Sequence, residues 1–247
     1  LEFTATADLS VTEIEAKYND KLIYDYPLKQ FRKDGYSKEV KVLQADLSPF
    51  DRALQGVLLS QYRRKVFEKY KKLIKPVILF KSKTIKESQS FFDEFAEGIK
   101  NLKVSDLQKI QQSKPDEAIE KVFQYLEANN ISFENMITEL REDFSEEKLI
   151  SVNSKDESEQ KQLAVNSLED EENEYRAVFA VDKLNEGWDV LNLFDIVRLY
   201  DTRDASKGKP GKTTMAEAQL IGRGARYCPF QITDEQPFYG RKYDDDI

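Results

Sequence analysis

The sequence contains no histidine and only one cysteine among its 247 residues. Histidine is the usual acid–base group near neutral pH and a common zinc ligand. Its absence therefore excludes Ser-His-Asp triads, histidine acid–base catalysis and histidine-liganded metals. The single Cys228 cannot form a disulfide within the chain, which indicates a reducing compartment. We predict no metal site formed by this chain.

The sequence also lacks a run of about 18 apolar residues and a secretory signal. These absences predict a soluble, cytoplasmic protein that has no contact with a membrane. An initiator methionine is missing as well, because the sequence begins at Leu1 inside an apolar, β-branched segment. We therefore expect the sequence to be a piece of a longer protein.

Charged residues are plentiful but mixed in sign: they make up 34% of the chain and leave a net charge of −8. The hydrophobic fraction of 40% is enough for a buried core, so the charges indicate a solvated surface rather than disorder. The negative balance argues against nucleic-acid binding over the whole surface. Such binding would require a local basic groove.

Short apolar runs alternate with amphipathic stretches along the chain. The run at 77–80 has no polar alternation, which is typical of a strand buried on both faces of a parallel sheet. Further strands are expected at 149–152, 177–181 and 195–200, and helices at 50–74, 85–99 and 214–225. This pattern predicts an α/β fold with a mostly parallel sheet covered on both faces, and ligands at the carboxyl ends of the strands.

Three further stretches carry weaker signals. Residues 21–46 are aromatic and strand-prone but interrupted by proline and glycine, which favours irregular strands and a connector. Residues 104–144 predict several amphipathic helices, and residues 153–173 predict a polar loop with a surface helix.

The strongest motif lies at 219–226, where Gln219 and Gly222 accompany two arginines, Arg223 and Arg226. Arginines three residues apart on a helix project from one face. Guanidinium groups are always charged and fork-shaped, so they neutralise phosphoryl oxygens during phosphoryl transfer. The alternative is an ordinary surface helix with a glycine-rich end.

A second motif, Asn-Glu-Gly-Trp-Asp at 185–189, follows a predicted buried strand. Gly187 permits a tight turn, and Asp189 is placed to accept a hydrogen bond from a ribose hydroxyl or from Arg226. The alternative is a simple turn at the end of a strand. We expect Trp188 to pack against the sheet edge rather than stack on a base.

A third motif, Lys81-Ser82-Lys83-Thr84, lies between a strand and a helix start. This position suits a nucleic-acid phosphate, held through backbone N–H groups, a hydroxyl and charge. The alternative is a capped helix with solvated lysines. The basic run at 63–75 is more typical of the solvated face of a helix.

Two other patterns are rejected. Gly211-Lys212-Thr213 imitates the end of a phosphate-binding P-loop, but Ser206 replaces the first glycine and a proline interrupts the loop, so we interpret it as a linker. Pro115-Asp116 with the Glu-x-Lys at 146–148 imitates a nuclease pattern, but the first pair is better explained as a helix start.

Four segments, taken in order, resemble motifs III, IV, V and VI of superfamily 2 helicases: LEFTAT at 1–6, KPVILFKSKT at 75–84, YRAVFAVDKLNEGWDV at 175–190 and AEAQLIGRGARY at 216–227. The form of the last two is similar to the restriction (Res) subunit of type III restriction-modification enzymes. The resemblance covers most of the chain, except that residues 104–173 carry no motif.

This resemblance implies two RecA-like domains with ATP and Mg²⁺ bound in the cleft between them. Residues 1–48 would be the end of the first motor domain and a connector. Residues 49–230 would form the RecA-like helicase C-terminal domain, an α/β parallel sheet flanked by helices, with a helical insertion at about 104–144. Residues 231–247 would begin the following region.

The resemblance also implies roles for individual residues. In the nucleotide site, Gly187 and Asp189 would border the nucleotide, Gln219 would position motif VI, and Arg223 and Arg226 would be arginine fingers. Leu220 departs from relatives that have an arginine at this position, which removes one possible basic contact.

Outside the nucleotide site, Thr4 and Thr6 would couple hydrolysis to strand movement. Lys81, Ser82 and Lys83 would hold the nucleic-acid backbone.

The function implied is that of the second motor domain of an ATP-dependent DNA translocase or helicase in a type III restriction endonuclease. Its partners would be double-stranded DNA, the first RecA-like domain of the same chain and the modification (methyltransferase) subunit. The phosphate-binding lysine and the magnesium-binding acidic residues of the family belong to the first domain, so we expect this chain alone to be inactive. The alternatives are another superfamily 2 DNA or RNA helicase, or a non-catalytic α/β interaction module.

Overall fold

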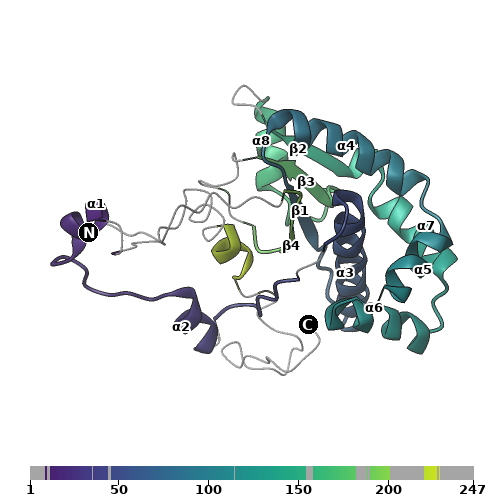
Figure 1. Ribbon diagram of the computed structural model, residues 1–247, viewed down its shortest axis with the longest axis horizontal. Coiled ribbons are helices and arrows are strands. Elements are labelled where there is room, and N and C mark those ends of the chain that lie inside the picture. Colours follow the sequence, from purple (N-terminus) through teal and green to yellow (C-terminus); the bar gives the residue numbers. More distant parts are fainter. Residues whose placement is uncertain are drawn as a thin grey trace.

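The computed structural model describes residues 9, 12–34, 36–43, 46–113, 115–153, 158–181, 188, 190–200, 220–226 and 228. Within these residues, four strands form one parallel sheet with the order β2-β3-β1-β4 (Figure 1). Their bounds are Val77–Lys81 for β1, Leu149–Val152 for β2, Ala177–Ala180 for β3 and Leu193–Arg198 for β4. The non-sequential order requires crossover connections, as in other α/β folds.

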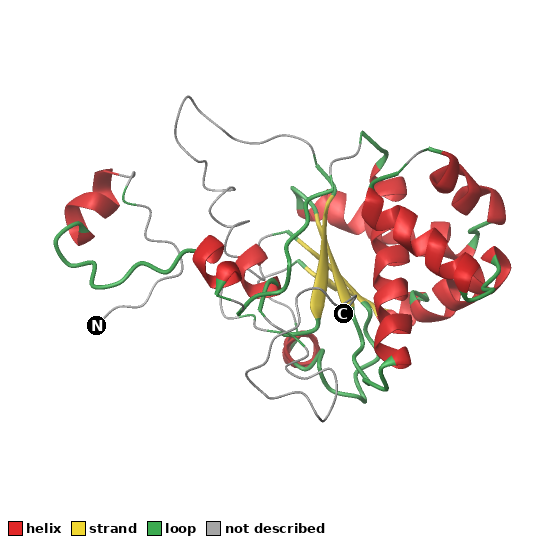
Figure 2. Ribbon diagram, turned by 90° about the horizontal axis from the view of Figure 1, so that it is seen from below, coloured by secondary structure: helices red, strands yellow, loops and turns green. Residues whose placement is uncertain are grey.

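Along the chain, helices lie between β1 and β2 and between β2 and β3, and helices pack on both faces of the sheet (Figure 2). The helices that precede or follow strands are α3 (Pro49–Lys69), α4 (Ile85–Lys100), α5 (Val104–Gln112), α6 (Glu117–Ala128), α7 (Phe133–Asp143), the short 3₁₀ helix η1 (Glu146–Lys148) and α8 (Glu159–Asn166). Nearer the N-terminus, α1 (Thr12–Tyr18) and α2 (Leu28–Lys33) extend away from the sheet (Figure 1). Residues 220–224 are also helical. The predicted α/β parallel sheet flanked by helices is confirmed.

Each face of the sheet contributes to a separate apolar cluster. Ile78 and Phe80 of β1 pack with Phe179 of β3 against α3, α4 and α7. Val77 and Leu79 lie in the other cluster, which includes Val165 of α8 and Trp188. Every residue of β1 is buried, because neighbouring strands flank it and helices cover both faces. This explains why its sequence shows no alternation.

Helix starts follow the predicted capping chemistry. Ser48 accepts a hydrogen bond from the backbone N–H of Asp51 and precedes Pro49 at the first helical position. Thr84 and Glu87 form a reciprocal capping box at the start of α4. Helix α3 ends at Lys69, earlier than predicted, and Lys71 has a left-handed φ of 55°.

Three other expectations need comment. The several helices predicted at 104–144 are confirmed as α5, α6 and α7. Strand β4 begins at Leu193 rather than 195, because Leu193 pairs with Val77. The domain boundaries at 48 and 230 remain predictions.

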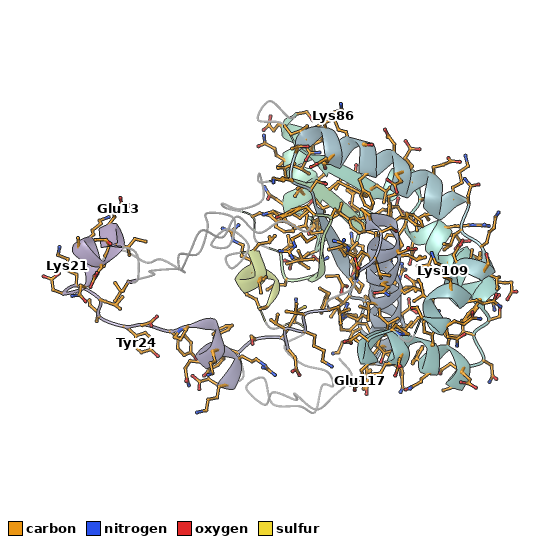
Figure 3. The ribbon with its side chains drawn as sticks, viewed as in Figure 1. Glu13, Lys21, Tyr24, Lys86, Lys109 and Glu117 are labelled. Atoms are coloured by element: carbon orange, nitrogen blue, oxygen red, sulfur yellow. The ribbon has the colours of Figure 1, made fainter. Side chains whose placement is uncertain are left out.

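The irregular strands predicted at 21–46 are wrong. The described residues of this stretch contain α2 and a single isolated bridge, Ser37 to Arg226. Their aromatic side chains contact one another instead of a sheet, with ring centroids 5.7 Å apart for Tyr24 and Tyr26 and 5.8 Å apart for Tyr26 and Phe31. The aromatic pattern therefore reflects a local cluster and not strand alternation. Figure 3 shows Tyr24 on this extended segment.

Gly56 of α3 lies at a close contact between this helix and the sheet. A Cβ atom at this position would lie 2.7 Å from Cδ1 of Ile78 and 2.8 Å from Cγ2 of Val197. We expect Gly56→Ala to lower the free energy of unfolding by about 1–3 kcal/mol in urea titrations, despite the higher helix propensity of alanine.

Gly222→Ala is the matched control, because nothing beyond the neighbouring backbone of its own helix lies within 4 Å of a Cβ atom at that position. Its free energy of unfolding should stay at or above that of the unmodified chain. Equal stability of the two variants would contradict close packing at Gly56.

Candidate nucleotide and nucleic-acid site

The carboxyl end of β1 carries the predicted nucleic-acid contacts. Lys81 and Ser82 are only 4% and 3% exposed, whereas Lys83 is exposed. The backbone N–H of Ser82 donates to the carbonyl of Ala180 at 3.1 Å, so this group is occupied within the sheet. Of the three predicted residues, only Lys83 presents its side chain to solvent.

Two backbone N–H groups at the start of α4 already donate hydrogen bonds to side chains of the same helix start. The backbone N–H of Thr84 donates to Oε2 of Glu87 at 2.9 Å, and the N–H of Glu87 donates to Oγ1 of Thr84 at 3.2 Å. A carboxylate therefore occupies part of the position that a phosphate would take at a helix N-terminus. The positive charge at this edge comes from Lys83 and Lys86, both exposed, and Figure 3 shows Lys86 at the outer surface.

A polar contact at the same edge was missed by the sequence analysis. Nδ2 of Asn153 donates to Oγ of Ser88 at 3.0 Å and to Oγ of Ser151 at 2.7 Å, which links the end of β2 to α4. The available signal was a polar residue directly after a short apolar strand.

In the turn at 185–189, the structure describes Trp188. Its side chain is 3% exposed, and Nε1 donates to the carbonyl of Val165 on α8 at 2.9 Å. The expectation that Trp188 packs rather than stacks on a base agrees with this position. Gly187 and Asp189 lie outside the described residues, as do Thr4, Thr6 and Gln219.

The segment 220–226, called the arginine segment below, contains both predicted arginine fingers. Its apolar residues Leu220 and Ala225 are 2% and 3% exposed. Leu220 belongs to the apolar cluster that includes Val165 of α8 and Trp188. A Cβ atom at Gly224 would lie 3.4 Å from Cδ2 of Leu193, so the segment rests against β4 (Figure 1). Arg223 and Arg226 are both partly exposed. The structure therefore holds the arginines on a packed element.

Lys38 lies in residues 36–43, called the connector below, and forms hydrogen bonds that hold the arginine segment in place. This role was not predicted from the sequence. Its ammonium donates to the carbonyls of Leu191 at 2.6 Å, Leu193 at 2.9 Å and Gly224 at 3.0 Å. Its backbone N–H donates to the carbonyl of Ala225 at 2.7 Å. A lysine between Ser37 and Glu39 gives no signal of such contacts in the sequence.

Burial lowers the pKa of Lys38 to about 8, and nearby Arg63 acts in the same direction. Cys228 and Asp195 oppose this lowering of the Lys38 pKa, whereas the charge of Arg226 adds to it. Burial also raises the pKa of the Cys228 thiol, which lies in the same neighbourhood. These groups therefore lie in a largely desolvated environment beside the arginine segment.

Three basic residues of α3 form ion pairs with acidic residues of other elements. Arg63 lies 2.5 Å from Asp195 of β4, Arg64 lies 2.5 Å from Asp143 of α7, and Lys65 lies 2.6 Å from Glu139 of α7. This part of the basic run therefore ties the helix to its neighbours, instead of forming only a solvated face.

Among the described residues, no group of cysteine, aspartate or glutamate side chains is arranged to hold a metal ion. No described helix is long and apolar enough to cross a membrane.

The chain is 35% identical over 235 residues to the "Probable type III restriction-modification enzyme HindVIP Res subunit" of Haemophilus influenzae (strain Rd), and the match covers 86% of this chain. The resemblance to type III Res subunits is confirmed. The chain spans about half the length of this Res subunit, since the match covers 46% of the relative.

A family model described as "HI_1054_N: N-terminal region" matches residues 213–247, which include the arginine segment. No solved structure gives a significant match.

Proposed function

We propose that this chain is the second motor domain of an ATP-dependent DNA translocase or helicase in a type III restriction endonuclease. The main support for this proposal is the similarity to a Res subunit over 86% of the chain. The packing of the arginine segment against β4 supports it as well. In this role the chain completes an ATPase site whose remaining groups come from another RecA-like domain.

The chemistry assigned to the arginine segment is electrostatic. Arg223 and Arg226 neutralise charge on the phosphoryl oxygens as the bond to the leaving group breaks. Gln219 orients this segment, and Gly187 and Asp189 border the nucleotide. ATP with Mg²⁺ supplies the reacting phosphoryl group, and we assign the groups that hold the ion to the first motor domain, as the resemblance to superfamily 2 helicases implies.

DNA contact is assigned to the carboxyl edge of the sheet. Lys81, Ser82 and Lys83 remain the proposed contact region, with Lys83 and its exposed neighbour Lys86 carrying the accessible charge. These contacts go to phosphates, which provide affinity but no sequence recognition. Thr4 and Thr6 would couple hydrolysis to movement along the strand.

The proposed partners are double-stranded DNA, the first RecA-like domain and the modification subunit, in the cytoplasm. A different superfamily 2 DNA or RNA helicase is the nearest alternative. Dependence of the ATPase on the modification subunit and on duplex DNA rather than RNA separates the two. A non-catalytic α/β module is the other alternative, and it predicts no dependence of any activity on Arg223 or Arg226.

The 247-residue chain alone should show no ATP hydrolysis and no DNA cleavage, with or without duplex DNA. The full-length protein, mixed with its modification subunit, should hydrolyse ATP in a DNA-stimulated manner. A phosphate-release assay on both proteins checks this. The proposal fails if the isolated chain has DNA-stimulated ATPase activity that Arg226→Ala removes, or if the full-length complex has none.

A further inference from the structure

Lys38 joins three segments that are far apart in the sequence. Its three ammonium hydrogen bonds reach residues that lie 153, 155 and 186 positions away along the chain. An ammonium group has three N–H donors, and all three have carbonyl partners in this arrangement. Nζ of Lys38 therefore links the connector to the start of β4 and to the arginine segment.

The β4 side of this junction is fixed by further contacts. The ammonium of Lys38 lies 4.0 Å from the ring centre of Phe194, and that ring lies 5.3 Å from the ring of Phe67 on α3. Next to Phe194, Asp195 forms its ion pair with Arg63 of α3. Lys38 thus attaches the connector to a strand that is itself anchored to a long buried helix.

The arginine side of the junction lies between the two arginines. The accepting carbonyls belong to Gly224 and Ala225, which separate Arg223 from Arg226. Ser37 adds an antiparallel bridge to Arg226 itself. A displacement of the connector by one residue would therefore move the backbone that carries both guanidinium groups.

We propose that Lys38 is a positioning residue for Arg223 and Arg226, which makes the placement of the arginines depend on the connector. The inference rests on the proposed function and adds a regulatory contact to that site. Movement of the connector relative to β4 breaks the three hydrogen bonds and releases the arginine segment. The ATPase is thereby competent only when the connector is seated.

The test compares Lys38→Met with Lys41→Met in the full-length protein bound to its modification subunit and duplex DNA. Methionine keeps an unbranched apolar stem but has no N–H donors. Lys41 lies on the same connector and is exposed, so it is the matched control. Lys38→Gln, which keeps two donors on a shorter stem, is the second variant if Lys38→Met does not fold.

Two quantities are measured. For Lys38→Met we expect kcat for ATP hydrolysis to fall by about a hundredfold, with the KM for ATP changing by less than about threefold. We also expect hydrogen exchange across 220–226, and tryptic cleavage after Arg223 and Arg226, to accelerate by at least about tenfold. Lys41→Met should match the unmodified protein in both measurements.

The outcomes separate the two proposals. If Arg223→Ala and Arg226→Ala abolish ATPase activity but folded Lys38→Met keeps its kcat, the positioning role is overturned and the motor function stands. If hydrogen exchange at 220–226 does not change in Lys38→Met, the anchoring contact itself is refuted, whatever the ATPase result. If the arginine variants keep full activity, the proposed function fails. The rate of hydrogen exchange across 220–226 in Lys38→Met then still decides whether Lys38 anchors the arginine segment.

Discussion

Arg226→Ala and Arg223→Ala should each reduce the kcat of DNA-stimulated ATP hydrolysis by about a thousandfold or more in the full-length protein. Arginine fingers act on charge that develops in the transition state, so their removal lowers kcat far more than it changes the KM for ATP. Both side chains are partly exposed on a segment whose backbone is held by Ser37 and Lys38. Truncation to alanine should therefore leave that backbone in place.

Arg32→Ala is the control for this experiment. Arg32 lies on α2 and forms an ion pair with Glu39, and the two side chains are 53% and 47% exposed. Its ATPase rate should equal that of the unmodified protein. Arg226→Lys should not restore activity, because an ammonium lacks the planar fork that binds two phosphoryl oxygens. Activity within about tenfold of the unmodified protein in both alanine variants would contradict the arginine-finger role.

Arg176→Met should be the most destabilising single change in the described core. Arg176 is 1% exposed, and its guanidinium donates to Asp143 at 2.7 Å, to the carbonyl of Pro76 at 2.9 Å and to Ser60 at 3.2 Å. It also lies 4.8 Å from the ring centre of Phe144. One side chain therefore connects the residues before β1 and β3 with α3 and α7.

Removing this cation leaves Asp143 largely buried with Arg64 as its remaining charged partner. Breaking a buried pair in this way costs about 3–5 kcal/mol, since Asp143 stays desolvated with only one of its two cationic partners. We expect a loss of that size in urea or thermal unfolding of Arg176→Met. Arg32→Met should change the free energy of unfolding by less than about 0.5 kcal/mol, because its ion pair is exposed. Equal stability of these variants would show that the buried network contributes little.

The same network sets a response to acid. Burial alone raises the pKa of Asp143, but Arg176 and Arg64 together hold that pKa below its usual range. A carboxyl whose folded pKa is depressed contributes stability above its unfolded pKa and loses it as the pH falls through the folded value. Acid unfolding should therefore depend less steeply on this carboxylate in Arg176→Met.

The sheet was predictable because its strands carry strong local signals. The run at 77–80 has no polar residue, and Thr84 with Glu87 specifies the start of the next helix by side-chain capping. The helices at 104–144 show clear apolar periodicity. These features depend on residues that are close in sequence, so they can be predicted without knowledge of the fold.

The contacts that hold the candidate site were not predictable in this way. Lys38 reaches carbonyls more than a hundred and fifty positions away, and Arg176 reaches Asp143 and Ser60 across 33 and 116 positions. Such contacts depend on the strand order, which local patterns do not encode. The motif at 219–226 named its arginines, but it gave no sign of the connector residue that fastens them. The strands predicted at 21–46 were wrong for a different reason, because the aromatic rings of this stretch contact near neighbours in the sequence and not a sheet.

We propose that Arg226 stabilises the transition state of ATP hydrolysis and contributes little to the binding of ATP. The most direct measurement is the affinity of the full-length, DNA-bound protein for ATP and for ADP–aluminium fluoride, with and without Arg226→Ala. In Arg226→Ala we expect the ATP affinity to change by less than about threefold, whereas the affinity for the transition-state analogue falls by about a hundredfold or more. Unchanged affinity for the analogue in Arg226→Ala would contradict the transition-state role.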